Sequence, residues 1–209
     1  MDIIGDATLT TLQAPASVSA SGSTAGVDTR HLAGAGGAIL AGYATAGTNP
    51  TLAVKLQAAP DGDVVTSVTP GTNTGTGTCT QVYGGPDAVA ETITVTLADA
   101  TTATVVGSVS GPLADATVGT LYQSAKVEFM LTAGATAFEA ADAFAIVTTA
   151  RTYADVAGGA FTGLTTARSM QKIALNFDKI NRYLRVTYVL GSTVTPAYAV
   201  SVAALSATQ

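Results

Sequence analysis

The chain has 209 residues, of which 47% are hydrophobic and only 11% are charged, with a formal net charge of −5. An ordinary soluble domain is about 25% charged, whereas this chain is rich in Thr, Ser and Gly. Disordered chains are charged and poor in β-branched residues, so the composition predicts a folded protein. Nucleic-acid binding requires clustered Lys and Arg, and the nine basic residues here are scattered, which argues against a nucleic-acid partner. A chain with so few charges can stay soluble through Thr, Ser and Gly or can bury surface against partners; we expect both to contribute, with an oligomer or larger assembly favoured.

The N-terminal half contains no targeting or membrane signal. Residues 1–6 have neither a basic region nor an apolar run, so the sequence predicts no signal peptide and synthesis in a cytoplasm. Residues 32–54 carry no charge, but Gly, Thr, Asn49 and Pro50 interrupt them. This segment is predicted to form strands and turns rather than a membrane span.

The first predicted strands are residues 38–43 and 52–57, separated by the turn-forming residues 46–50. Leu52, Val54 and Leu56 alternate with other residues and are expected to share one buried face. Short alternating runs of this kind are typical of β-strands.

From about residue 61 to residue 150 the chain becomes rich in Thr, Gly, Ala and Val. A glycine-threonine run at residues 69–78 is interpreted as a loop that enters a strand. The strands predicted after it are residues 90–97, 102–109, 126–132 and 143–149, with turns at 84–87, 110–112 and 133–134. Apolar residues alternate with Thr in these strands, which is typical of strands with one buried face and one solvent-exposed face.

After residue 150 the pattern resembles the first sixty residues again. An apolar run from Met170 to Phe177 leads to a turn at 178–181, and residues 184–190 then alternate strictly. Residues 191–193 are predicted to turn the chain into a last strand at 197–205. Many short strands with Gly and Pro between them predict an all-β fold, either β-sandwiches or jelly rolls.

The change in composition predicts two domains. Residues 1–60 plus 151–209 would form a discontinuous outer β domain, and residues 61–150 an inserted, sandwich-like β domain. An insertion of this kind destabilises the outer domain only slightly, because the entropic cost of closing a loop grows slowly with loop length. One long sandwich is the alternative.

Residue types that carry chemistry are scarce. His31 is the only histidine and Cys79 the only cysteine, so neither a hydrolytic triad nor a zinc site can be assembled from convergent ligands. Asp61 and Asp63 form the most suggestive carboxylate pair, but no calcium-loop series follows them, and solvated turn carboxylates are the favoured reading. The sequence therefore predicts no enzyme activity, no metal and no cofactor.

Four residues are candidates for contact with a partner. Arg182 and Arg185 lie close together and could reach acidic groups on a neighbouring subunit or a capsid shell; alternatively they pair with Asp178 or remain solvated. His31 is interpreted as a loop or interface histidine, and Tyr43 as an exposed aromatic residue of the same kind.

Several segments of the middle region resemble a module of phage head decoration proteins. They are residues 75–78, 93–96, 119–122, 129–138 and 141–146. In that family a G-N-G-T-type start precedes a string of strands, and the run T-A-G-x-x-A-F-x-x-G-D-x-F-x-I ends it. Here Thr76 replaces the usual Asn, and Ala141 replaces the glycine before Asp142.

The flanking regions resemble small phage structural proteins, at residues 48–57, 173–177 and 182–186. In those proteins a short D-G-x-x-[FY]-x-D-V turn soon follows the equivalent of residues 55–57. In this chain Asp61-Gly62 and residues 153–156 fall on either side of the proposed insertion, which supports the same domain boundary.

The two resemblances imply a cement protein on the capsid surface of a tailed-bacteriophage virion. The implied partners are the major capsid protein and further copies of the chain, with a trimer favoured. The outer domain would hold the shell, and the inserted domain would project. The alternative is a tail, baseplate or fibre component or a host-glycan-binding module, against which the absence of Trp counts.

Overall fold

The protein is almost entirely β-structure in the computed structural model, which describes residues 7–60, 62, 64–191 and 197–207. Within these residues the single helical element is a short 3-10 turn, η1 (Phe177–Lys179). None of the described residues forms a helix that is long and apolar enough to cross a membrane. All the pairings between described strands are antiparallel, and the all-β prediction is confirmed.

The chain divides into two compact units. Unit 1 comprises Met1–Asp61 and Thr152–Gln209, and unit 2 is the continuous segment Gly62–Arg151 between them. The boundaries expected from composition, 60/61 and 150/151, each differ from these by one residue.

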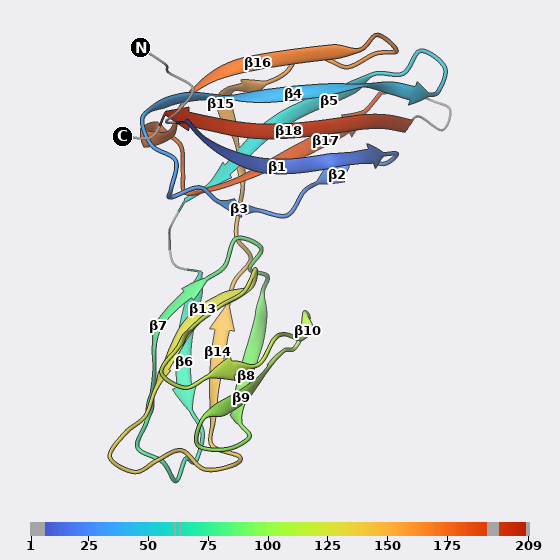
Figure 1. Ribbon diagram of the computed structural model, residues 1–209. Coiled ribbons are helices and arrows are strands. Elements are labelled where there is room, and N and C mark those ends of the chain that lie inside the picture. The colour runs from blue at the N-terminus through green and yellow to red at the C-terminus, as the bar shows by residue number, and fades with distance from the viewer. Residues whose placement is uncertain (1–6, 61, 63, 192–196, 208–209) are drawn as a thin grey trace. The chain divides into compact units, whose positions relative to one another are not determined.

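Unit 1 is a sandwich of two antiparallel sheets (Figure 1). Its strands are β1 (Ala7–Val18), β2 (Gly22–Ser23), β3 (Val27–Asp28), β4 (Ala35–Ala46), β5 (Leu52–Ala59), β15 (Ala154–Ala160), β16 (Ser169–Asn176), β17 (Tyr183–Leu190) and β18 (Ala197–Ala207). Over the described residues, one sheet has the order β1-β18-β4-β16 and the other the order β15-β5-β17-β2, with β3 also paired to β17.

One apolar core lies between the two sheets of unit 1. Leu40, Val200 and Val202 project into it from the first sheet, and Val54 and Val186 from the second. The expected buried face of β5 is confirmed, since Leu52, Val54 and Leu56 are all fully buried. Burial of these side chains is the main stabilising contribution, at about 25 cal/mol per Å² of apolar surface.

Strand β1 is absent from the sequence-based prediction, and its pairing explains why. Register shifts occur between Thr11 and Gln13 and again between Gln13 and Ala16 where β1 pairs with β18. Such bulges insert extra residues and change which face the next side chain occupies. The residues of β1 therefore do not alternate continuously between apolar and polar, and the sequence does not reveal the strand.

Two predicted turns in unit 1 have different outcomes. The turn expected at 178–181 is η1 and the bend that follows, with the Asn176 side chain accepting a hydrogen bond from the Asp178 backbone amide at 3.0 Å. Residues 192 and 193 of the turn predicted at 191–193 lie outside the described residues.

Unit 2 is a second, smaller sandwich (Figure 1). Its strands are β6 (Val65–Pro70), β7 (Thr78–Gly84), β8 (Glu91–Leu97), β9 (Thr102–Gly107), β10 (Gly111–Pro112), β11 (Ala116–Thr117), β12 (Leu121–Gln123), β13 (Val127–Thr132) and β14 (Ala143–Thr148). In the part of the chain that the structure describes, one sheet has the order β10-β9-β8-β14-β6, with β11 on β9, and the other β12-β13-β7.

The core of unit 2 joins its two sheets around a few aromatic rings. Tyr122 stacks on Phe129 with ring centroids 4.6 Å apart, and Phe138 meets Phe144 edge to face at 6.0 Å. Aromatic pairs in these geometries contribute beyond the area they bury. A side chain at Gly77 would collide with the Phe138 ring, so the glycine-rich loop before β7 lies directly against this core.

The two ends of unit 2 lie side by side. The Thr149 backbone amide donates to the Val64 carbonyl at 2.8 Å, and the Arg151 guanidinium donates to the carbonyls of Gly62, Gly84 and Gly85 at 3.2, 2.7 and 2.9 Å. In unit 1 the flanking strands also meet, since Ala58 of β5 pairs with Ala154 of β15. An insertion with adjacent ends leaves the host sheet in register.

Candidate functional site

The four residues proposed for partner contact do not form one site. Tyr43 lies on the sheet β1-β18-β4-β16, whereas Arg182 precedes β17 and Arg185 lies within it, in the opposite sheet of the same unit. His31 follows β3, and its Nε2 is 2.6 Å from the Thr10 hydroxyl oxygen. The four must therefore be considered on separate surfaces.

Cys79 lies on β7 and is partly buried. Burial raises the pKa of its thiol to about 12, so the sulfur is protonated at neutral pH and a poor nucleophile. Among the described residues, no three His, Cys, Asp or Glu side chains gather as a metal site would require. Asp61 and Asp63, the carboxylate pair noted in the sequence, lie outside the described residues.

Arg185 belongs to an ordered polar network on the outer face of the sheet β15-β5-β17-β2. Its guanidinium donates two hydrogen bonds to the Gln57 side-chain oxygen, at 3.0 and 2.8 Å, and lies 4.2 Å from the centre of the Tyr153 ring. Asp155 accepts hydrogen bonds from Gln57 at 2.9 Å and from Lys55 at 3.0 Å. We call these five residues the polar network, a pattern typical of a solvated sheet face.

Arg182 pairs with Asp28 rather than with Asp178. Its guanidinium donates to one Asp28 carboxylate oxygen at 2.8 and 3.2 Å, and Arg30 contacts the same oxygen at 2.7 Å. Asp178 accepts a hydrogen bond from the Gly34 backbone amide instead. Burial raises the pKa of Asp28, but the hydrogen bonds from Arg182 and Arg30 outweigh it and hold that pKa at about 2.

The other sheet of unit 1 presents a very different outer face. Its outward-facing residues follow from the burial alternation and the strand register, and they are small or uncharged at most positions. We call this surface the small-residue face; it consists of Leu9, Thr11, Gly37, Ile39, Ala41, Tyr43, Met170, Lys172, Ala174, Ala199, Ser201, Ala203 and Leu205.

The centre of the small-residue face carries little side-chain bulk apart from Ile39. Ser201 of β18 pairs with Ala41 of β4, and Ala203 pairs with Ile39. Solvated outer faces of antiparallel sheets normally carry polar side chains. Here three apolar side chains are exposed instead, with exposed fractions of 80% for Met170, 63% for Leu9 and 36% for Ile39.

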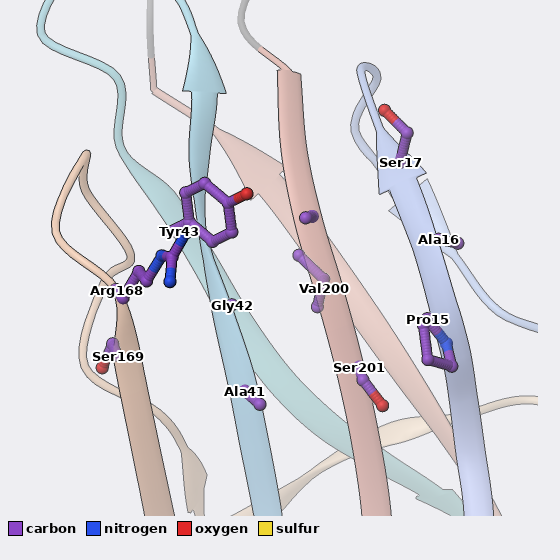
Figure 2. A pocket seen from close by; sticks show the side chains of 11 residues that line it. Pro15, Ala16, Ser17, Ala41, Gly42, Tyr43, Arg168, Ser169, Val200 and Ser201 are labelled. Atoms are coloured by element: carbon purple, nitrogen blue, oxygen red, sulfur yellow. The ribbon is translucent and has the colours of Figure 1, made fainter.

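A shallow groove of about 580 Å³ crosses this face (Figure 2). Pro15 and Ser17 of β1 border it on one side, and Tyr43 and Arg168 on the other. The Arg168 guanidinium lies 5.3 Å from the centre of the Tyr43 ring, a cation–π contact that fixes both side chains. Because Ala41, Ala199 and Ser201 line the groove between these walls, it can admit a side chain from a partner.

Charge is nearly absent from the small-residue face. In the part of the chain that the structure describes, its charged side chain is Lys172 on the edge strand β16, and the adjoining Arg168 borders the groove just before that strand. No described Asp or Glu belongs to it. Any partner therefore meets a neutral centre with a positive border along one edge.

The outer faces of unit 2 are mainly polar, although Val106 of β9 is 42% exposed among them. Thr92, Thr94 and Thr96 face outward from β8, and Thr104 of β9 lies opposite Thr96. Its buried carboxylates are fully engaged in holding turns: Glu91 accepts hydrogen bonds from the Val109 and Ser110 amides and from the Ser110 hydroxyl, at 3.0, 2.9 and 2.7 Å. Burial raises the pKa of Glu91, but these hydrogen bonds outweigh it and leave that pKa below its usual value.

Formal charge is divided unevenly between the units. Unit 2 contains eight acidic and two basic residues, a net charge of −6, whereas unit 1 contains six acidic and seven basic residues, a net charge of +1. The acidity of the whole chain therefore comes from unit 2. A nearly neutral unit 1 can approach another protein surface at little electrostatic cost.

Sequence reasoning did not identify the small-residue face, although a signal was present. In residues 197–205, Tyr198, Val200 and Val202 alternate with Ala199, Ser201 and Ala203. The large residues mark the buried face, and the small ones mark an outer face that lacks the usual Thr or Lys. That signal requires the strands to be aligned, because each strand supplies only a few of the small residues.

Comparison with known proteins gives little guidance. No family model and no curated protein matches the chain. Two crystal structures of Xanthomonas campestris FlgL, in space groups H3 and C2, are 22% identical with a TM-score of 0.35. The first match covers 49% of this chain and 33% of the FlgL chain, so this chain spans about a third of that protein's length.

Proposed function

We propose that the protein is a structural component of a tailed-bacteriophage virion that decorates and stabilises the capsid by binding the outer surface of its shell. The proposal takes its starting point from the resemblance to head decoration proteins. Decoration would depend on many weak contacts between β surfaces. Because the shell repeats its binding sites, these contacts add up to a high overall affinity without any chemical step.

The observation on which the proposal rests is the contrast between the two units. Unit 1 contains seven of the nine basic residues and an outer face on which Lys172 is the charged side chain, whereas unit 2 has a net charge of −6 and threonine-rich outer strands. Unit 1 therefore suits contact with the shell and with further copies of the chain. Unit 2 suits the solvent-facing position, where like charge keeps virions apart.

The polar network is the proposed contact with the major capsid protein. Arg185 is held in place by Gln57 and Tyr153, so little side-chain entropy is lost when it binds. Ordered guanidinium groups are suited to carboxylates on a partner surface.

Immunogold labelling of intact virions with an antibody to this protein tests the proposal. Dense and even labelling of heads is expected. Label confined to tails would indicate a tail or fibre component instead. Absence of label would show that the protein is not exposed on the virion surface.

Shell binding is tested by adding the full chain to heads that lack it and sedimenting the mixture. The wild type is expected to sediment with the heads, and Arg185→Glu to do so at least tenfold more weakly. Glu139→Lys, on an exposed loop of unit 2, is the charge-changed control and should bind like the wild type. Equal binding by both variants would exclude the polar network as the contact.

A host-glycan-binding module is the second candidate, because of one surface of unit 2. Tyr83 of β7 is 50% exposed, and its cross-strand neighbour Glu128 accepts a hydrogen bond from Gln123 at 2.7 Å. An exposed aromatic ring beside polar groups can stack on a sugar. A glycan-array signal that Tyr83→Ala abolishes would favour this function over capsid decoration.

A further inference from the structure

We infer that the small-residue face is the surface through which two copies of this chain pack against each other, sheet on sheet, about a two-fold axis. This deepens the homo-oligomer part of the proposed function. It does not depend on shell binding, because it concerns the protein free in solution.

The outer sheet faces of this molecule differ in their residues. The outer face of the sheet β15-β5-β17-β2 carries the polar network, and the outer strands of unit 2 carry threonine. A covered sheet face gains from Ala, Gly and Ser along its central strands, with Ile39 among them and Met170 and Leu9 on the edge strands. In the free protein the other outer faces are mainly polar, with single exposed apolar residues such as Val189 and Val106, whereas the small-residue face combines three exposed apolar side chains with a nearly uncharged centre.

The small-residue face is large enough to form a dimer interface. Four strands spaced about 4.8 Å apart and about nine residues long, at about 3.4 Å per residue, cover roughly 600 Å². Two copies would therefore bury roughly 1,200 Å² in total, which is the lower end of the range for stable protein interfaces. Small side chains also allow the two backbones to approach closely.

The charges at the border of the small-residue face are compatible with a two-fold contact. The positive residues Arg168 and Lys172 lie at the β16 edge, and the opposite edge strand, β1, contributes Leu9 and Thr11. A two-fold axis parallel to the strands, between β18 and β4, places each β16 edge over the partner's β1 edge. The positive edges are thereby kept apart, and no acidic residue of the described face is buried without a partner.

The same axis brings complementary shapes together. Met170 pairs in register with Ala41, and the bulged part of β1 that includes Pro15 lies at the other edge of the sheet. Met170 of each copy then faces the groove bordered by Pro15 and Ser17 on the other copy (Figure 2). Its flexible thioether side chain can adapt to a shallow groove. Such a contact is isologous and closes as a dimer, whereas the family resemblance implies a trimer.

The mass of the full chain, measured by sedimentation equilibrium across the micromolar range, tests the inference. The wild type is expected to have twice the mass of one chain. Ser201→Arg places a charge at the centre of the face and should halve the mass. Ala53→Arg, on an exposed position of β5 in the opposite sheet, is the matched control and should remain dimeric.

Oxidation of Met170 by hydrogen peroxide provides a second readout that needs no substitution. Its sulfoxide should form several-fold more slowly in concentrated protein than in dilute protein, because the dimer covers the thioether. Circular dichroism establishes that Ser201→Arg remains folded.

Three outcomes would overturn the inference. They are a monomeric wild type with Met170 oxidised at the same rate at all concentrations, a trimeric mass, or equal masses for Ser201→Arg and Ala53→Arg. If the wild type is monomeric and Ser201→Arg no longer sediments with phage heads, the face binds the shell and not a second copy. Failure of shell binding with an intact dimer would instead reject the proposed function alone.

Discussion

Ala141 occupies a backbone conformation that suits glycine. Its φ is +76°, and it stands where the resembled decoration module has glycine, directly before Asp142. The conformation is imposed by its neighbours: the Ala141 amide donates to the Leu97 carbonyl at 2.9 Å, and Asp142 accepts hydrogen bonds from the Thr74, Gly75 and Glu139 amides. The position is therefore strained in this chain.

We expect Ala141→Gly to stabilise unit 2 by about 0.5–1 kcal/mol, because glycine adopts a positive φ without the steric cost of a Cβ. Ala140→Gly, at the exposed neighbouring position, should have the opposite sign and destabilise the unit by up to about 1 kcal/mol. Urea unfolding of the two variants measures the difference. A loss of stability in Ala141→Gly would show that the alanine methyl group contributes packing that outweighs the strain.

Asp28 links the stability of unit 1 to acid pH. Its folded pKa of about 2 lies below the ordinary value of 3.8, so its contribution is fully present above about pH 4 and is lost as the pH falls to about 2. The pair is partly exposed, and solvent screening limits this contribution to about 1 kcal/mol.

Asp28→Asn should therefore be less stable than the wild type by about 1 kcal/mol at neutral pH and nearly equal to it at about pH 2. Urea unfolding at the two pH values, followed by a signal specific to unit 1, provides the measurement. A difference between variant and wild type that does not change with pH would mean that the Asp28 carboxylate is not the titrating group.

At the scale of elements, strand β4 depends on its inward-facing glycines. A Cβ built on Gly42 would lie 2.7 Å from the Ala199 carbonyl oxygen and 2.8 Å from a methyl group of Leu164. Both distances are shorter than real side chains tolerate, and the Ala199 oxygen belongs to the neighbouring backbone, which cannot move aside. The close approach of β18 to β4 thus requires glycine at this position.

Gly42→Val should consequently destabilise unit 1 by about 2–4 kcal/mol through overpacking between the sheets. Ala53→Val makes a related substitution at an exposed position of β5 and should change the stability by less than about 0.5 kcal/mol. Thermal unfolding of both variants gives the comparison. A tolerated Gly42→Val would imply that the two strands can separate without loss of the core.

At the scale of the whole molecule, the insertion of unit 2 is expected to be structurally independent of unit 1. The ends of unit 2 are joined by the Val64–Thr149 and Gly62–Arg151 hydrogen bonds, and β5 already pairs with β15 in unit 1. Replacement of residues 62–151 by a short Gly-Ser linker should leave unit 1 folded, and residues 62–151 expressed alone should also fold.

Calorimetry of the full chain should then show two transitions, each matching one of the separated units. A fragment of residues 62–98, which separates β8 from β9, is the negative control and should be unfolded. If either intact unit unfolds when the other is removed, the two units are energetically coupled and the domain division does not describe folding.

Strict alternation made much of the fold predictable. In β8 the buried residues Ile93, Val95 and Leu97 alternate with threonine, and the predicted strand 90–97 is nearly identical to the observed one. A period of two is a direct consequence of strand geometry, so it is visible in the residues themselves. The change of composition near residues 60 and 150 was also visible, because the composition of a segment does not depend on its partners in the fold.

Partners distant in the sequence were decided by the tertiary structure. Arg182 could be expected to bind a carboxylate, but its pairing with Asp28, 154 residues away, depends on β3 lying beside β17. The bulges of β1 removed the periodicity that would have revealed that strand.

By itself, the sequence determined that this protein is all-β, charge-poor and poor in catalytic residue types, because composition and alternation are local properties. The tertiary structure decided which residues share a surface. Ala41, Met170 and Ser201 belong to three strands and become one face through the register of β16, β4 and β18. Register depends on long-range pairing and buried packing, which no single segment encodes.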